Sequence, residues 1–253
     1  VAYRNLDELN KELNTVMLRR KKEDVLDLPP KIYTTEHIEL TRKQRILYKE
    51  IRQGIVDNLD NILEIPNPLS CTVRLRQLTG GLFGDDNPKL ERVKDMLEEI
   101  TESGHKALIF SQWEQVTAVY KEALKDYNPA YIVGAVDPED RQKEVDRFQN
   151  DPTCKVAIGT IGAMGTGLTM TAASYVFFVD KRYWDAENKQ AEDRAHRIGT
   201  TNTVNVVSLV ATNTVDEGIE EMLRDNKALF DRVVEGKGSR VDVGEILRKI
   251  LQY

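Results

Sequence analysis

The stretch KALIFSQWEQVTAVYKEAL, residues 106–124, decides the fold. Four consecutive apolar residues at 107–110 predict a buried strand. The residues that follow place apolar side chains at helical spacing, namely Trp113, Val116, Val119, Tyr120 and Leu124. A strand that leads within a few residues into a helix is the repeating unit of α/β proteins, whose strands run parallel.

The alternation continues on the C-terminal side of this unit. Further strands are expected at residues 131–133, 156–158, 175–179 and 204–209. Helices fit between them at residues 138–149, 186–198 and 215–226. This order predicts an α/β fold in which a parallel sheet carries helices on both faces. Ligands of such sheets bind beyond the carboxyl ends of the strands, so the candidate loops follow Phe110, Val133, Ile158 and Val179.

The residues before 87 have a mainly helical pattern. The expected elements are a helix over 5–17, a break at Leu28-Pro29-Pro30, an extended segment over 32–40, a long helix from a capping box at Thr41 and Gln44 through Ile62, and a short helix over 69–79. Asn87 and Pro88 are expected to cap and open the next helix. At the other end, residues 236–239 resemble a hinge before a last helix over 243–251.

Composition limits the kind of protein this is. The chain has 253 residues, 40% of them hydrophobic, which suffices for one large core or for a core with a small subdomain. Its net charge of −6 counts against a protein that coats nucleic acid with a basic surface, so any such contact must be local. The longest apolar stretches, such as residues 204–211, are too short to span a membrane, so we expect an intracellular protein without membrane contacts.

Three local basic clusters are candidates for nucleic-acid contact: residues 19–22, Arg74 with Arg76, and Lys181 with Arg182. Taken alone, each is more typical of a solvated face. Cys71 and Cys154 are far apart and are expected to be small buried hydrophobes. Because the three histidines are also isolated from one another, we expect no structural zinc site.

A pair of arginines gives the sharpest chemical signal. A helix over residues 188–198 would place Gln190, Arg194 and Arg197 at positions i, i+4 and i+7, on one face. Two guanidiniums that point the same way repel each other unless an anion, such as a carboxylate or a polyphosphate, lies opposite. The alternative is a surface lattice of salt bridges with Glu187, Asp193 or neighbouring acids.

A glycine-rich loop over residues 159–167 follows one of the expected strands. Glycines there allow backbone amides to approach a phosphate or a ribose, although a tight turn without a ligand would need the same residues. The chain has no GxxxxGK[ST] loop and no acidic DExx motif, and Asp216-Glu217 is expected to cap a helix instead. The chain therefore lacks the main machinery for phosphoryl transfer and offers only the complementary face of a nucleotide site.

The order of several motifs resembles the C-terminal helicase lobe of the Swi/Snf family, within helicase superfamily two. These motifs are LRRKKEDVLDLPPK (18–31), LRQL (75–78), PKL (88–90), KALIFSQW (106–113), DRQKEVDRF (140–148), AMGTGLTMTAA (163–173) and QAEDRAHRIG (190–199). The resemblance implies a RecA-like lobe over residues 87–235. It also implies a linker helix, a crossing strand and a helical insertion over 1–86, and a brace helix over 236–253.

The resemblance also implies roles for individual residues. Arg194 and Arg197 would reach across a cleft to ATP, bound with Mg mainly by a first lobe, and Arg197 is the preferred arginine finger. Gln190 would support the cleft, and Gly165 and Gly167 would lie near the ribose. Contacts to the DNA backbone would come from Ser111, Gln112, Trp113 and Thr160. For Ser111 and Gln112 the alternative is helix capping, and for Trp184, which matches a family tryptophan, it is a place in the core.

The implied function is that of the second motor lobe of an ATP-dependent translocase or remodeller of double-stranded DNA. Its partners would be the duplex and the N-terminal ATPase lobe of the same protein, and the chain alone would not hydrolyse ATP. It would act in the nucleus of a eukaryote, or in the cytoplasm or nucleoid of a prokaryote or phage host. The alternatives are a strand-separating helicase lobe and a non-catalytic regulatory module. Departures from the family pattern, at Met164, Thr169, Asp185-Ala186 and Thr200, leave the subfamily and the contacts of the glycine loop open.

Overall fold

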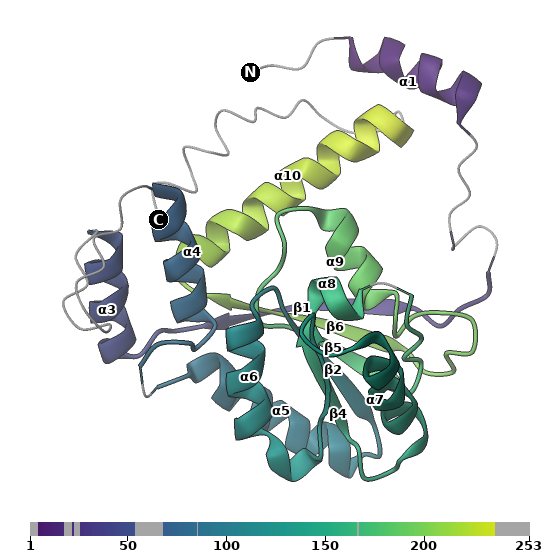
Figure 1. Cartoon of the computed structure of the whole chain (residues 1–253). Helices are drawn as coiled ribbons and strands as arrows, with labels where there is room; N and C mark the ends of the chain where they lie inside the picture. Colours follow the sequence, from purple (N-terminus) through teal and green to yellow (C-terminus); the bar gives the residue numbers. More distant parts are fainter. Residues whose placement is uncertain are drawn as a thin grey trace.

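One parallel sheet organises the chain (Figure 1). The computed structural model describes residues 5–17, 22, 26–53, 68–84, 86–165 and 167–235. Within them the strands lie in the order β1-β6-β5-β2-β4-β3, and every pair is parallel. Their bounds are β1 Lys31–Ile38, β2 Lys106–Ser111, β3 Ala130–Ile132, β4 Val156–Thr160, β5 Ala173–Phe178 and β6 Val204–Ala211. The predicted α/β fold with a parallel sheet is confirmed.

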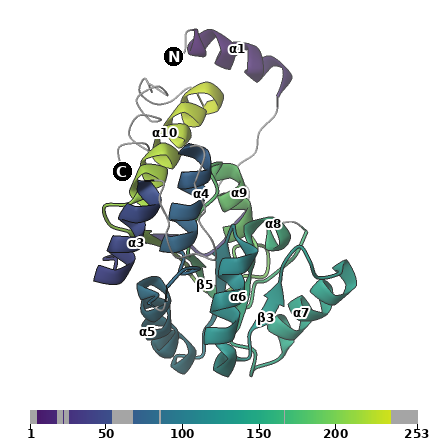
Figure 2. The same ribbon diagram turned by 60° about the vertical axis from the view of Figure 1, so that its left-hand side comes forward.

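Helices cover both faces of this sheet (Figure 2). Alternate residues of β2 point to opposite sides, because successive side chains of a strand alternate. Leu108 and Phe110 pack with α7 (Pro138–Asn150), α8 (Ile161–Met164) and α9 (Asp185–Glu192). Ala107 and Ile109 pack with α5 (Pro88–Glu102) and α6 (Glu114–Ala123). A strand buried on both sides must be apolar throughout, which explains the continuous run at 107–110.

The other helices form a layer at the β1 side of the molecule. They are α1 (Leu6–Val16), α3 (Arg42–Arg52), α4 (Pro68–Thr79) and α10 (Val215–Glu235). A third apolar cluster joins α3 and α4 to the start of α10, and α1 contacts α10. Both predicted N-caps form, since Thr41 Oγ1 accepts from Gln44 N and Asn87 Oδ1 accepts from Leu90 N. The predicted capping box at Thr41 is not completed, because the Gln44 side chain donates to Asp86 O instead of bonding back to Thr41.

The segment predicted as extended over residues 32–40 is β1, and it pairs with β6 along its whole length. The sheet therefore takes one strand from the region before residue 87. The predicted long helix ends at Arg52, and its continuation to Ile62 lies outside the described residues. The predicted hinge at 236–239 and the last helix at 243–251 also lie outside them, as do residues 19–21 and the side chain of Cys71.

Two expectations about helix boundaries are wrong. The helix predicted over 186–198 ends at Glu192, and turns follow it. The helical ladder is interrupted because other groups occupy its carbonyls: Met170 N donates to Arg194 O, and Thr200 Oγ1 donates to Ala195 O. Asp216 does not cap α10. Thr214 Oγ1 accepts from Asp216 N, while the Asp216 carboxylate turns into the protein toward Lys89 and Thr79.

Cys154 is buried and free, as predicted. The described ranges contain no group of three or more acidic, His or Cys side chains that could hold a metal ion. Across the same ranges, no helix is both long and apolar enough to cross a lipid bilayer.

Gly159 lies where β4 meets its neighbour too closely for a side chain. A Cβ there would overlap the Ile132 carbonyl oxygen and the Met164 sulphur. We expect Gly159→Ala to lower the free energy of unfolding by about 1–3 kcal/mol, because a backbone oxygen cannot move aside as a flexible side chain can. Urea denaturation measures this. Gly134→Ala, where the added Cβ meets nothing within 4 Å, is the control and should change stability far less.

Candidate nucleotide and nucleic-acid face

The candidate loops meet at one edge of the sheet because all strands run the same way. Ser111 ends β2, Thr160 ends β4, and Asp180 lies two residues after the end of β5. Ser111 Oγ donates to Asp180 Oδ2 and accepts from Trp113 N at 3.0 Å. Gln112 N donates to Asp180 Oδ1 at 2.8 Å. The hydroxyl of Ser111 is thus turned inward, where it fixes the turn that carries Gln112 and Trp113.

Asp180 is the centre of a buried cluster that the sequence reading missed. Burial raises the pKa of Asp180, and the Arg76 guanidinium, the Ser111 hydroxyl and the Gln112 amide oppose that rise. Arg76, from α4, has one nitrogen 3.9 Å from the Asp180 carboxylate, and the same nitrogen donates to Lys181 O. A single acid after an apolar strand was the signal that could have revealed this cluster.

Arg76, Lys181 and Arg182, from two of the basic clusters named from the sequence, are engaged within the protein. Arg76 is 1% exposed, and its guanidinium lies over the rings of Tyr183 and Trp113, 4.7 and 5.8 Å from their centres. Lys181 pairs with Glu220 at 2.9 Å, and Arg182 pairs with Glu187 at 2.7 Å. These charges are compensated within the protein, so they are poor candidates for phosphate contacts.

Trp184 is 69% exposed at the start of α9, so the alternative that it belongs to the core is wrong. Trp113 and Gln112 are partly exposed at the start of α6. Thr160 caps the short helix α8, where its hydroxyl accepts from Ala163 N. Gln112, Trp113 and Thr160 therefore lie at the ends of adjacent strands with some surface open to solvent.

Arg194 contacts the glycine loop directly, whereas Arg197 contacts Thr169, two residues after the loop. Arg194 donates to Gly165 O at 2.7 Å and to Leu168 O at 3.1 Å, so most of its hydrogen-bonding fork is used on the loop. Arg197 is exposed and donates one hydrogen bond, to Thr169 Oγ1 at 3.1 Å. Burial lowers the pKa of Arg194, and the nearby charge of Arg197 lowers it further. The two arginines therefore lie close enough for their charges to interact, although they are not on one helical face.

The predicted alternative of a salt-bridge lattice does not hold for these two arginines. Among the residues that the structure describes, the acids named for that lattice bind other cations: Glu187 pairs with Arg182, and Asp193 pairs with Lys22 and Lys31. Gln190 is exposed near the end of α9. The edge thus presents an exposed arginine whose charge no described carboxylate compensates.

The glycine loop has the openness that a nucleotide needs. Gly167 adopts φ +72, and a Cβ there would meet nothing within 4 Å, whereas a Cβ on Gly165 would overlap the Ile161 carbonyl. The backbone at Gly167 is therefore open to close approach by another molecule. The lysine loop and the metal carboxylates of a complete site are absent from the sequence, so this edge fits half of a nucleotide site.

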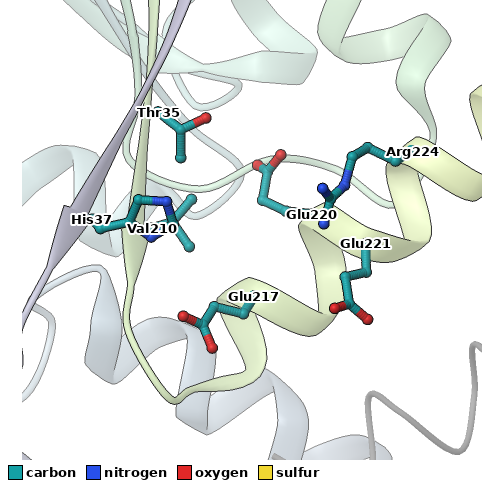
Figure 3. Close-up of a pocket in the computed structure, with 7 residues that line it drawn as sticks. All are labelled: Thr35, His37, Val210, Glu217, Glu220, Glu221 and Arg224. Atoms are coloured by element: carbon teal, nitrogen blue, oxygen red, sulfur yellow. The ribbon is translucent and has the colours of Figure 1, made fainter.

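A pocket of about 380 Å³ lies between β1 and α10, and it does not suit a phosphate (Figure 3). Its walls include His37, Glu217, Glu220, Glu221 and Arg224, all of which are drawn in Figure 3. Carboxylates outnumber the single arginine there, and like charges repel.

The parallel sheet with helices on both faces, and arginines set against a glycine loop at its carboxyl edge, define a RecA-like C-terminal helicase lobe. Residues 88–199 match the family model described as helicase conserved C-terminal domain. The chain belongs with the C-terminal lobes of Swi/Snf-type helicases.

Similar proteins agree with this family. The mouse (Mus musculus) DNA annealing helicase and endonuclease ZRANB3 is 32% identical over 95% of the chain, and the putative ATP-dependent helicase/translocase YwqA of Bacillus subtilis is 28% identical over 92%. The matches span only 22% and 27% of those proteins. The Sulfolobus solfataricus SWI2/SNF2 ATPase core in complex with dsDNA matches with a TM-score of 0.66 at 26% identity, over 96% of this chain and 55% of that one. The C-terminal part of the Fun30 ATPase domain shares the fold, with a TM-score of 0.71 at 18% identity, over 88% of this chain and 96% of that one.

Proposed function

We propose that this chain is the second motor lobe of an ATP-dependent translocase of double-stranded DNA, and that Arg197 is its arginine finger. The observation that carries the proposal is the exposed guanidinium of Arg197, held beside the open glycine loop by one hydrogen bond to Thr169. A guanidinium aimed at developing phosphoryl charge typically accelerates the transfer by roughly 10³–10⁵. The chain has an arginine that can stabilise this charge, but it lacks the phosphate-binding lysine loop and the acidic motif that phosphoryl transfer also needs.

Arg194 has a different role in this proposal. Its fork is already engaged on Gly165 O and Leu168 O, so it is a positioning residue that holds the glycine loop beside Arg197. Gly167 would then lie near the ribose, and Gln190 would line the cleft from the end of α9. ATP, when bound, supplies the phosphoryl bond that is broken. The first lobe would hold the phosphates and Mg, so this chain alone would be inactive.

Contacts to DNA would come from the loop ends at the same edge. The Gln112 side-chain amide and the Thr160 hydroxyl can donate to phosphates, and such contacts carry no sequence code. The backbone amides of Gln112 and Trp113 already donate to Asp180 and Ser111, so they position the turn instead. Ser111 would act indirectly, because its hydroxyl fixes the turn before Gln112. The negative net charge also favours a few local contacts over a basic surface. The duplex-bound Sulfolobus relative supports the duplex as the partner.

The type of nucleic acid that stimulates ATP hydrolysis distinguishes the proposed translocase from a strand-separating helicase and from a regulatory module. We expect the complete protein that carries this chain to hydrolyse ATP faster with duplex DNA than with single-stranded DNA or RNA, without separating strands. Steady-state ATP hydrolysis with each polymer, together with a strand-displacement assay, measures both properties. Strand displacement would favour the helicase alternative, and no nucleotide hydrolysis with any polymer would favour a regulatory module.

A further inference from the structure

The segment that bears Arg194 and Arg197 is held by contacts with other parts of the chain. α9 ends at Glu192, and residues 193–199 form turns without a continuous helical ladder. Arg194 fastens this segment to the glycine loop. Asp193 and Glu192 also bond to Lys22, Lys31 and Tyr33, which lie in β1 or before it in the chain. The position of Arg197 therefore depends on contacts from a distant part of the sequence.

Glu192 is the main contact with β1. It is 4% exposed, and its Oε1 accepts from Lys31 Nζ at 2.6 Å and from Tyr33 Oη at 2.7 Å. Burial alone would lower the pKa of Lys31, but the charge and hydrogen bond of Glu192 reverse this and raise it. Burial and the same carboxylate raise the pKa of Tyr33 to about 12. Lys31 thus stays protonated and Tyr33 stays neutral at neutral pH, so both can donate to Glu192.

Further bonds extend this anchor to the residue before Arg197. Asp193 pairs with Lys31 at 3.2 Å and with Lys22 at 2.7 Å. His196 Nε2 donates to Pro29 O at 2.7 Å, and Lys22 Nζ donates to His196 O. Each contact ties the arginine segment to the chain that leads into β1, the first strand of the lobe. Arg197 follows His196 directly.

We infer that Glu192 is a positioning residue for Arg197, and that Lys31 and Tyr33 hold it from the chain that enters β1. The inference rests on the proposed function, in which a first lobe precedes that chain. A shift of this chain during lobe closure is then passed through the Lys31–Glu192 pair to the arginine segment. The arginine reaches its working position only when the connection between the lobes is correctly placed.

The test uses the complete protein with the variants Glu192→Gln, Lys31→Met and the double variant. We expect kcat with saturating duplex DNA to fall by about tenfold while KM for ATP changes by less than about twofold, since the arginine acts in the transition state. We expect the double variant to be no slower than the slower single variant, because the two residues act as one unit. Backbone amides of residues 193–199 should exchange with deuterium at least about tenfold faster.

Asp140→Asn and Lys143→Met are the matched controls, because this pair is equally short, at 2.7 Å, but exposed on α7. Both controls should leave kcat and amide exchange unchanged. Tyr33→Phe removes only one hydrogen bond to Glu192, and it replaces the charge variants if they fold poorly. We expect it to lower kcat by roughly twofold to threefold without changing the melting temperature. Unchanged kcat and unchanged exchange in Glu192→Gln or Tyr33→Phe would overturn the inference.

The two proposals fail in different ways. If Arg197→Ala hydrolyses ATP normally, Arg197 is not the arginine finger. Faster amide exchange over residues 193–199 in Glu192→Gln would still show that Glu192 holds this segment. If Arg197→Ala is inactive while Glu192→Gln is normal in both kcat and exchange, only the positioning role is lost.

Discussion

Arg197→Ala in the complete protein is expected to lower DNA-stimulated ATP hydrolysis by roughly 10³-fold or more, while ATP still binds. Arg197 is the exposed arginine at the glycine loop, and no described carboxylate neutralises it. Its removal takes away charge stabilisation that is needed only in the transition state. Nucleotide binding to the first lobe would be unaffected. Turnover with saturating duplex DNA and equilibrium binding of a non-hydrolysable analogue measure the two effects.

Two further variants test whether the loss of activity is specific to Arg197. Arg42→Ala removes an exposed arginine at the start of α3, and it should hydrolyse ATP at the normal rate. Arg197→Lys keeps the charge but not the planar fork, so it should recover only a small part of the activity. Near-normal turnover in Arg197→Ala would rule out the finger, whatever the other variants do.

Lys89→Met is expected to lower the free energy of unfolding by about 3–5 kcal/mol, because it leaves a buried carboxylate without its cation. Lys89 is 0% exposed, and its ammonium donates to Asp216 Oδ2 at 2.6 Å and to Val179 O at 2.7 Å. Asp216 would keep its bonds from Thr79 Oγ1 and Ala211 N, but these do not balance its charge. Urea denaturation followed by circular dichroism measures the change.

Lys94→Met is the control for that change, since Lys94 lies on the same helix in a more exposed pair with Glu91 and should matter by less than about 1 kcal/mol. Adding Asp216→Asn to Lys89→Met removes the uncompensated charge and should recover part of the loss. A cost near that of the control would show that the buried pair is not needed for stability.

The parts of the fold that could be predicted depended on short-range patterns. The apolar run at 107–110 predicted a strand buried on both faces, and β2 is one. Thr41 and Asn87 predicted helix starts because a cap is completed by an amide three residues away. The two arginines were found for an incorrect reason, since helical spacing was expected and a series of turns is present.

The missed features all join residues that are far apart in the chain. Asp180 binds Arg76 and the turn after Ser111, Asp216 binds Lys89, and Glu192 binds Lys31. No periodicity marks such partners, because a buried charge is compensated by whichever group the fold brings near it. Arg76 illustrates this, as the sequence placed it in a basic cluster and the fold buried it between two aromatic rings.

The sequence by itself determined the alternation of strands and helices, the edge of the sheet at which the candidate site residues lie, and the absence of a phosphate-binding lysine loop. Each follows from residues that are neighbours in the chain. Only the tertiary structure decided that Arg194 holds the glycine loop while Arg197 stays exposed. That division depends on where the carbonyls of Gly165 and Leu168 lie in space. The hydrogen bonds that a guanidinium makes depend on which acceptors lie close to it, and the packing of the chain decides where those acceptors are.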